Sequence, residues 1–136
     1  MDDPLTAIER MAGFDEEVGH RHGVEYPLKM TVATSDGTRI IAARYSSDGN
    51  PGSLYFSTDI RTLKELHPEI KELQGLSDDA RAIVSEPLGD VVGAWNAVPP
   101  STNGIVQPGQ DELYQFTTRC PGVTASPKER VSLRPN

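Results

Sequence analysis

The stretch that decides the fold is LKMTVATSDGTRIIAARY, residues 28–45. Two runs rich in β-branched and apolar residues flank Asp36-Gly37, and Asp-Gly between such runs is typical of a β-hairpin with a two-residue type I′ turn. We therefore predict an antiparallel hairpin over residues 28–45. The two-residue loop sets the facing pairs, which from the turn outward include Ser35–Thr38, Val32–Ile41, Met30–Ala43 and Leu28–Tyr45.

The predicted hairpin has one apolar face and one mixed face, because side chains alternate between the two sides of a strand. The apolar face carries Leu28, Met30, Val32, Ile41, Ala43 and Tyr45. The mixed face carries Lys29, Thr31, Ala33, Ile40, Ala42 and Arg44. The apolar face needs a core packed against it, whereas the mixed face is compatible with cover by a helix or by solvent.

The composition is that of one acidic domain with a modest core. The chain has 136 residues, 36% of them hydrophobic, and a net charge of −7. Phosphate contacts need clustered Lys and Arg, so we expect no nucleic-acid partner. No apolar run reaches the roughly 18 residues of a membrane span, and the acidic start does not resemble a signal peptide. With a single cysteine that excludes an internal disulfide, we expect a cytoplasmic protein without a membrane partner.

A long helix is predicted at the start of the chain. Asp3 can cap it and Pro4 takes the first helical position, where its missing N–H has no cost. The helix runs to about His22, with Gly23 following it. Its apolar positions are Leu5, Ile8, Met11, Ala12, Phe14 and Val18. The positions expected to face water are Glu9, Arg10, Glu16 and Glu17.

The remaining sequence predicts short elements. We expect strands over 53–57 and 81–85, helical turns over 58–66 and 69–73, and a last hairpin that pairs 104–106 with 113–117. Leu63 and Leu66 are expected to point inward. The predicted class is α+β, with antiparallel β-sheets and flanking helices. Residues 1–118 form the domain, and 119–136 are predicted to be a loosely ordered tail because periodicity ends near Pro121.

Residue chemistry alone gives no catalytic residue, metal site or cofactor. Cys120 precedes a proline, and its one charged neighbour is Arg119, so we interpret it as an incidental cysteine. His20 and His22 point about 200° apart on a helix and cannot share a metal ion there. His67 is isolated before a proline, and no zinc or calcium motif is present.

A structural ion pair is predicted between Arg44 and Glu86. In the predicted register, Lys29 lies opposite Arg44, and like charges facing across a strand pair are unfavourable. Glu86 follows the apolar run 81–85, where a partly buried carboxylate needs a partner or solvent. We expect Glu86 to lie within reach of Arg44 and to have a structural role.

Four segments together resemble the small stand-alone class II glutamine amidotransferases of bacteria. They are TSDGTRIIAARY (34–45), SLYFS (53–57), AIVSEPL (82–88) and WNAVPP (95–100). Each segment is a weak signal alone, but the four occur in the order of that family, and the likeness covers roughly residues 3–117.

The resemblance implies the N-terminal-nucleophile hydrolase fold, an αββα sandwich of two antiparallel sheets between helical layers. In that family an N-terminal cysteine attacks the side-chain amide of glutamine and releases ammonia. An arginine, an Asn-Gly oxyanion hole and an aspartate that binds the substrate complete the site, and all lie in the first half of the domain.

This sequence departs from that pattern. Residue 2 is Asp2 rather than cysteine, and Asn103-Gly104 is expected in a late loop. The chain therefore resembles the C-terminal half of such a domain, from a truncated or split gene or a shortened chain, and no catalytic residue transfers to it.

Two functions remain open. In the first, the chain is a scaffold half, inactive alone, that self-associates or pairs with a catalytic half and meets glutamine or a γ-glutamyl compound only then. In the second, it is a non-catalytic interaction module that pairs through exposed strands.

Overall fold

The computed structural model describes residues 3–87, 94–109, 111–119 and 129–132. Its three helices are α1 (Pro4–Arg21), α2 (Ile60–Leu66) and α3 (Lys71–Gln74). The strands are β1 (Lys29–Ser35), β2 (Ile40–Ser46), β3 (Tyr55–Ser57), β4 (Ile83–Val84), β5 (Trp95–Ala97), β6 (Thr102–Val106) and β7 (Glu112–Gln115). Sheet A has the order β1-β2-β6-β7 and sheet B the order β4-β3-β5, with antiparallel pairing throughout. The predicted α+β class with antiparallel sheets is confirmed.

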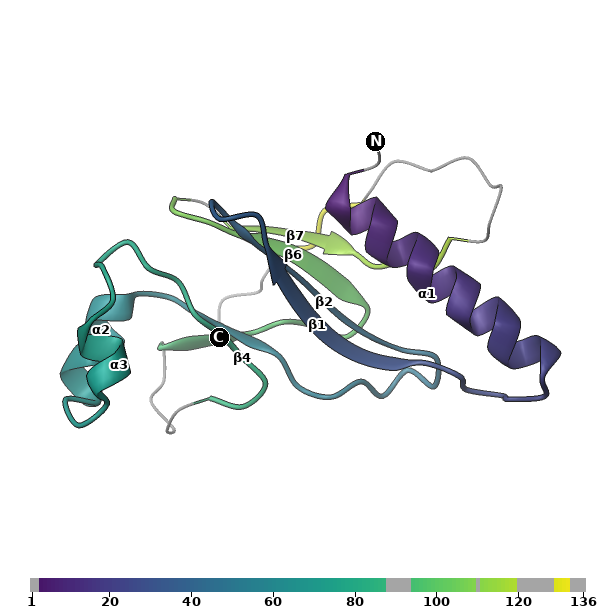
Figure 1. Ribbon diagram of the computed structural model, residues 1–136, viewed down its shortest axis with the longest axis horizontal. Coiled ribbons are helices and arrows are strands. Elements are labelled where there is room, and N and C mark those ends of the chain that lie inside the picture. The colour runs from purple at the N-terminus through teal and green to yellow at the C-terminus, as the bar shows by residue number, and fades with distance from the viewer. Residues whose placement is uncertain (1–2, 88–93, 110, 120–128, 133–136) are drawn as a thin grey trace.

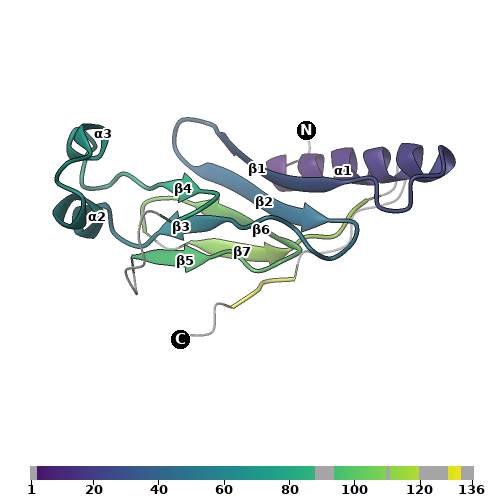
Figure 2. The ribbon, with the colours of Figure 1, turned by 90° about the horizontal axis from the view of Figure 1, so that it is seen from below.

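The elements form layers around two main cores (Figures 1 and 2). The first core lies between α1 and sheet A, and it comprises Ala12, Met30, Ala43 and Phe116 with Ile8, Leu28, Val32 and Tyr45 packed around them. The second lies between the two sheets and comprises Ala42, Leu54, Phe56, Val98 and Val106. α2 and α3 lie at the opposite end of the molecule from α1, where a third cluster packs them against Trp95 of β5.

The hairpin is present, but its loop is longer than predicted. The structure pairs Ser35 with Ile40, and its register differs by two residues from the predicted one, so Met30 faces Tyr45. The reason lies in the loop side chains. The Asp36 carboxylate accepts hydrogen bonds from the N–H groups of Thr38 and Arg39, both at 3.0 Å, which stabilises a four-residue loop. A type I′ turn needs a positive φ at both central residues, but Gly37 is the one loop residue with a positive φ, so the prediction of a type I′ turn is wrong.

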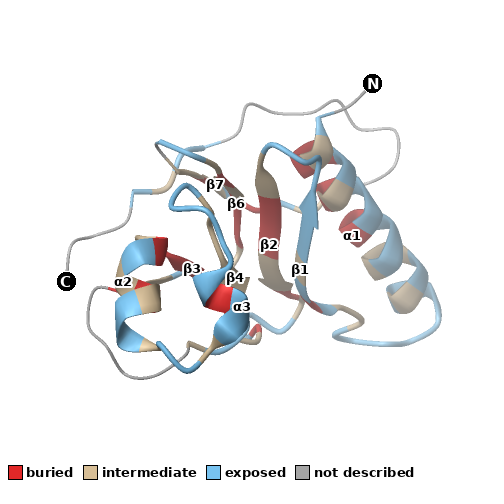
Figure 3. Ribbon diagram, turned by 60° about the vertical axis from the view of Figure 1, so that its left-hand side comes forward, coloured by how far each residue is buried: buried red, intermediate tan, exposed pale blue. Residues whose placement is uncertain are grey.

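The division of the hairpin into two faces survives this correction, because a shift of two residues returns each side chain to the same side. Met30, Val32, Ala43 and Tyr45 pack beneath α1. The mixed face is divided between the two strands: its β1 residues, Lys29, Thr31 and Ala33, are exposed to solvent, which is one of the two predicted alternatives, whereas its β2 half is covered. Ile40 and Ala42 pack instead against sheet B, and Figure 3 shows buried residues along β2, between the two layers.

α1 begins and ends as predicted. The Asp3 side chain accepts hydrogen bonds from the N–H groups of Leu5 and Thr6, and Pro4 opens the first turn. His22 is the C-cap, and Gly23 follows with a φ of 79°, which favours glycine.

The predicted apolar and polar faces of α1 need correction. Met11, Phe14 and Val18 are exposed, whereas Glu9 is completely buried. The helical positions explain both results. Glu9 lies one turn after Leu5 and so faces sheet A, while the other three lie on the opposite side of the helix.

Most of the other predicted elements are present. α2 is capped by the Asp59 side chain and buries Leu63, but Leu66 is exposed, contrary to prediction. β5 was not predicted as a strand. Asn103 was expected in a loop but lies buried in β6, because β6 starts at Thr102 and pairs on both sides.

Parts of the predicted tail have defined contacts. The Gln115 N–H donates to the Glu129 carbonyl and the Val131 N–H to the Leu113 carbonyl, both at 2.8 Å, so residues 129–131 lie alongside β7. The division into 1–118 and 119–136 stays a prediction. Across the helices that the structure describes, none combines the length and the apolar character that crossing a membrane requires.

Candidate functional site

A buried polar cluster joins α1 to sheet A. Glu9 of α1 lies over β6, where the Asn103 side-chain amide donates to Glu9 Oε1 at 3.1 Å. The Arg119 Nε donates to Glu9 Oε2 at 2.6 Å, and the Thr117 N–H reaches Glu9 Oε1 at 3.4 Å. The side chains of Glu9 and Arg119 are only 1% and 10% exposed. Three segments far apart in sequence therefore meet at one carboxylate.

The backbone holds this cluster closely. The Arg119 N–H donates to the Glu9 carbonyl at 3.1 Å, so the segment after β7 runs along α1. Gly13 permits the approach, because a Cβ there would lie 2.1 Å from the Arg119 carbonyl oxygen. A side chain at residue 13 is thus incompatible with the observed packing.

The chemistry of the cluster is that of a structural contact between α1 and sheet A rather than that of a catalytic pair. Both carboxylate oxygens of Glu9 accept hydrogen bonds, and a guanidinium neutralises the charge, so the group is not poised as a general base. The Asn103 Oδ1 is buried and has no hydrogen-bond partner. Its amide orientation follows from Glu9, because only the NH₂ end can donate to a carboxylate.

A second candidate is a cleft of about 190 Å³ at the tip of the hairpin. It is lined by the hairpin loop, by the segment before β4 and by the turn after β6, and its residues are Ser35, Gly37, Thr38, Arg39, Ile40, Asp79, Ala80, Arg81, Val106, Gln107 and Pro108. The cleft therefore spans both sheets. Its charged groups are two arginines and one aspartate.

Both arginines of this cleft are already paired. Arg81 makes a bidentate contact to the Asp111 carboxylate, at 2.9 and 2.8 Å, and also donates to the Ser57 and Gln107 carbonyls. Arg39 binds Asp36, and this side-chain hydrogen bond, with two backbone N–H groups, lowers the pKa of Asp36 to about 2. The cleft thus carries little uncompensated positive charge.

Arg44 connects the two sheets. Its guanidinium donates to the carbonyls of Gly52, before β3, and Val98, after β5. Thr31, not Lys29, lies opposite Arg44, so the like-charge reason for an Arg44–Glu86 pair is wrong. Glu86 is exposed, and among the interactions of the described residues neither of the two has the other as a partner. The Arg44–Glu86 ion pair itself stays a prediction.

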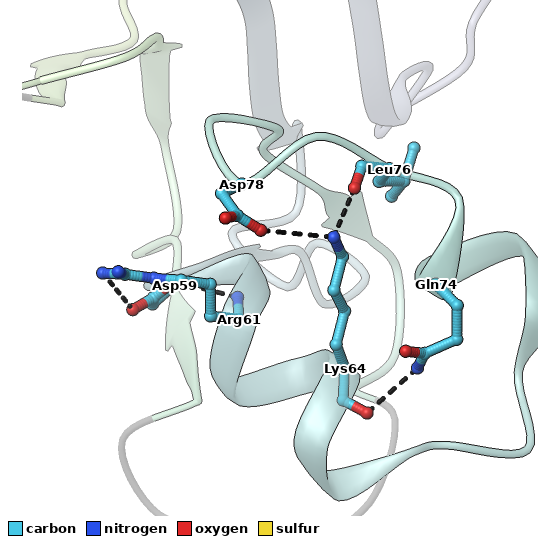
Figure 4. Close-up of polar contacts among 6 residues, drawn as sticks. All are labelled: Asp59, Arg61, Lys64, Gln74, Leu76 and Asp78. Atoms are coloured by element: carbon cyan, nitrogen blue, oxygen red, sulfur yellow. Dashed lines mark hydrogen bonds and ion pairs between the residues drawn. The ribbon is translucent and has the colours of Figure 1, made fainter.

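Two further polar groups stabilise the ends of the molecule. Beneath α1, Glu16 accepts hydrogen bonds from the hydroxyls of Tyr45 and Ser47, and burial together with Glu16 raises the pKa of Tyr45 to about 12. At the other end, Lys64 donates to the Leu76 carbonyl and pairs with Asp78 at 3.3 Å, which closes the loop after α3 on α2 (Figure 4).

The remaining sequence candidates do not converge on a site. Cys120 lies outside the described residues. His20 contacts the Glu25 carbonyl and His67 contacts Glu69, each at 3.2 Å. Within residues 3–87, 94–109, 111–119 and 129–132, no three His, Cys, Asp or Glu side chains gather as metal ligands do.

Comparison with solved structures supports the family resemblance. The chain matches a glutamine aminotransferase class-II domain protein from Silicibacter pomeroyi, with a TM-score of 0.65 and 27% sequence identity. This chain has a class II glutamine amidotransferase-like fold. The match covers 86% of this chain but 45% of the other, so the chain spans less than half the length of that protein. No family profile and no curated protein match the sequence.

The Glu9–Asn103–Arg119 cluster was missed by sequence reasoning. A usable signal existed for Glu9, whose spacing from Leu5 and Ala12 places it on the buried face of the helix. No local signal pairs it with Asn103 or Arg119, which are 94 and 110 residues away.

Proposed function

We propose that this chain is the scaffold half of a class II glutamine amidotransferase domain. Its sheets back a pocket in which glutamine, or a γ-glutamyl compound, is hydrolysed once a catalytic half supplies the cysteine nucleophile. The proposal is supported above all by the 27% identical match to the Silicibacter pomeroyi protein over 86% of this chain.

The chemistry of the described residues agrees with a supporting role. The buried carboxylate of Glu9 is held by Arg119 and Asn103, which fix α1 to sheet A. Arg44 and the Arg81–Asp111 pair join the two sheets or their connecting loops. These contacts stabilise the layers of a sandwich, and none of them leaves a nucleophile beside a base.

The chain alone is expected to release no ammonia from glutamine. The assay uses the purified 136-residue chain with glutamine and measures ammonia with a coupled enzyme. Activity of the isolated chain contradicts the proposal. A second arm adds the part of the Silicibacter pomeroyi protein that this chain does not match, and ammonia release that requires both pieces supports it.

The genomic sequence gives a less laborious test. An upstream reading frame that encodes Met-Cys and a later Asn-Gly supports a split or interrupted amidotransferase, because these residues are the family's nucleophile and oxyanion hole. The proposal includes a cytoplasmic location, which the single cysteine fits since no disulfide is needed.

A second candidate function is a non-catalytic module that pairs through an exposed strand. The observation in its favour is the position of β1, which lies at the edge of sheet A and has mostly exposed side chains. Proline at Thr31 and, separately, at Ala33 tests it, because proline removes one backbone donor from the edge. Loss of a co-purifying protein with one proline variant favours the module, whereas unchanged partners exclude it.

A further inference from the structure

The outer edge of β7 is covered by a later segment of the same chain. β7 is the last strand of sheet A, and its inner side pairs with β6. On its outer side, the Gln115 N–H donates to the Glu129 carbonyl at 2.8 Å. The Leu113 carbonyl accepts from the Val131 N–H, also at 2.8 Å. Residues 129–131, the edge segment, therefore occupy the place of a further strand.

The edge segment is held by its backbone rather than by its side chains. The side chains of Glu129 and Arg130 are exposed, and Val131 is half-buried. Between residues that the structure describes, no side chain of the edge segment makes a hydrogen bond or a salt bridge. A backbone hydrogen bond adds little net stability, because water replaces it when it opens. The hold is therefore weak, and any β-strand can supply the same backbone groups.

The opposite edge of sheet A has no such cover. β1 is the first strand in the sheet order, and no described segment pairs with its outer side (Figure 2). Its side chains are mostly exposed. An open strand edge is a template on which another strand can add. Sheet A thus has one covered edge and one open edge.

Without the edge segment, β7 matches a second copy of itself. In an antiparallel pair centred on Tyr114, this residue lies opposite its counterpart, and Leu113 lies opposite Gln115 of the second copy. The Gln115 N–H then donates to the Leu113 carbonyl of the second copy, and two-fold symmetry repeats the bond. The edge segment now provides this same bonding pattern. Glu112 lies opposite Phe116, so no like charges face each other, and the two tyrosines form a favourable aromatic pair.

We propose that the edge segment guards β7 against strand addition, and that its release opens β7 to a second copy of this chain, which docks its own β7 antiparallel. While the segment is in place, the edge of sheet A that is left for a partner strand is β1. This inference does not rest on glutamine chemistry. It adds a direction to both candidate functions, because a catalytic half or another partner that extends sheet A then does so at β1.

The first test compares two proline variants of the full chain. Val131→Pro removes the N–H that binds the Leu113 carbonyl. Ser132→Pro is the matched control, because the Ser132 backbone makes no hydrogen bond to another described residue. Loss of one backbone bond raises the open fraction about fivefold, and a dimer needs two open copies, so Val131→Pro is expected to tighten self-association roughly 25-fold. Sedimentation measures this as a shift from 14.8 kDa toward twice that mass, with no shift for Ser132→Pro.

The second test locates the contact by cross-linking in a Cys120→Ser background. Tyr114→Cys is expected to form a disulfide between two copies, because facing Cα atoms at the centre of the β7 pair are near enough for one. Arg130 lies opposite this position when the edge is covered, so Val131→Pro is expected to speed the disulfide about tenfold or more. Thr31→Cys on the open β1 edge is the control, since its cross-linking rate is expected not to depend on residue 131.

Three results overturn the proposal: equal self-association of Val131→Pro and Ser132→Pro, a Tyr114→Cys disulfide that forms at the same rate with and without Val131→Pro, or a Val131→Pro dimer that cross-links only through Thr31→Cys. Far-ultraviolet circular dichroism and the fluorescence of Trp95 check that each variant is folded. Unfolding of the chain by Val131→Pro also overturns the proposal, because the edge segment is then a part of the fold rather than a cover.

Discussion

Removal of the Glu9 carboxylate is expected to destabilise the fold severely. Glu9→Ala leaves the Arg119 guanidinium, which is 10% exposed, without its carboxylate, and deprives the Asn103 amide of its acceptor. Breaking one side of a buried ion pair costs about 3 to 5 kcal/mol. Domains of this size are stable by only about 5 to 15 kcal/mol, so the loss is a large fraction of the total.

Urea unfolding measures this loss. Trp95 is the single tryptophan of the chain, so its fluorescence and far-ultraviolet circular dichroism can be followed as two independent probes. With a urea dependence of about 2 kcal/mol per molar, a loss of 3 to 5 kcal/mol lowers the midpoint by about 2 M. Coincident transitions by both probes justify the two-state treatment.

The matched control is an exposed ion pair on the same helix. Arg21 pairs with Glu17, and the Arg21 side chain is 71% exposed. Exposed pairs of this kind contribute roughly 0 to 1 kcal/mol, so Arg21→Ala is expected to shift the midpoint by less than about 0.5 M.

A double variant separates the charge from the packing. Glu9→Met with Arg119→Met removes both charges and keeps unbranched side chains of similar length, so its cost is expected to be smaller than the sum of the single changes by about 2 kcal/mol. The reasoning is refuted if Glu9→Ala costs no more than Arg21→Ala, or if the two methionine changes are additive.

Three other expectations can be measured independently. Gly13→Ala lowers the melting temperature, because its Cβ would lie 2.1 Å from the Arg119 carbonyl oxygen, whereas Gly75→Ala, with no atom nearer than 3.8 Å, leaves it nearly unchanged. Tyr45 has a pKa of about 12 in the folded chain against an ordinary value of 10. The protonated hydroxyl therefore stabilises the fold fully below pH 10, and this stabilisation is lost as the pH rises toward 12. Tyr45→Phe is expected to remove this pH dependence of the unfolding free energy in alkaline unfolding experiments. The Asp36 carboxyl is expected to titrate near pH 2 by nuclear magnetic resonance, and a midpoint near 3.8 contradicts the hydrogen-bonded loop.

The local pattern of the sequence determined where the helices and strands form and which face of each strand a side chain lies on. The hairpin faces were predicted correctly even though its register was not, because period-two alternation is unaffected by a shift of two residues. The helix start was equally local, since Asp3 and Pro4 act within one turn. The resemblance to class II glutamine amidotransferases also came from the order of short segments, and the structural match supports it.

Only the tertiary structure decided what packs against each face of the hairpin and which buried polar groups contact one another. Sheet B covers the β2 half of the mixed face of the hairpin, where Ile40 and Ala42 pack, while the β1 half stays exposed. Glu9 is buried because Asn103 and Arg119, about a hundred residues later in the chain, supply the donors that a buried carboxylate needs. Spacing along a helix tells which way a side chain points, but the cost of burying its charge depends on partners that only the folded chain brings to it.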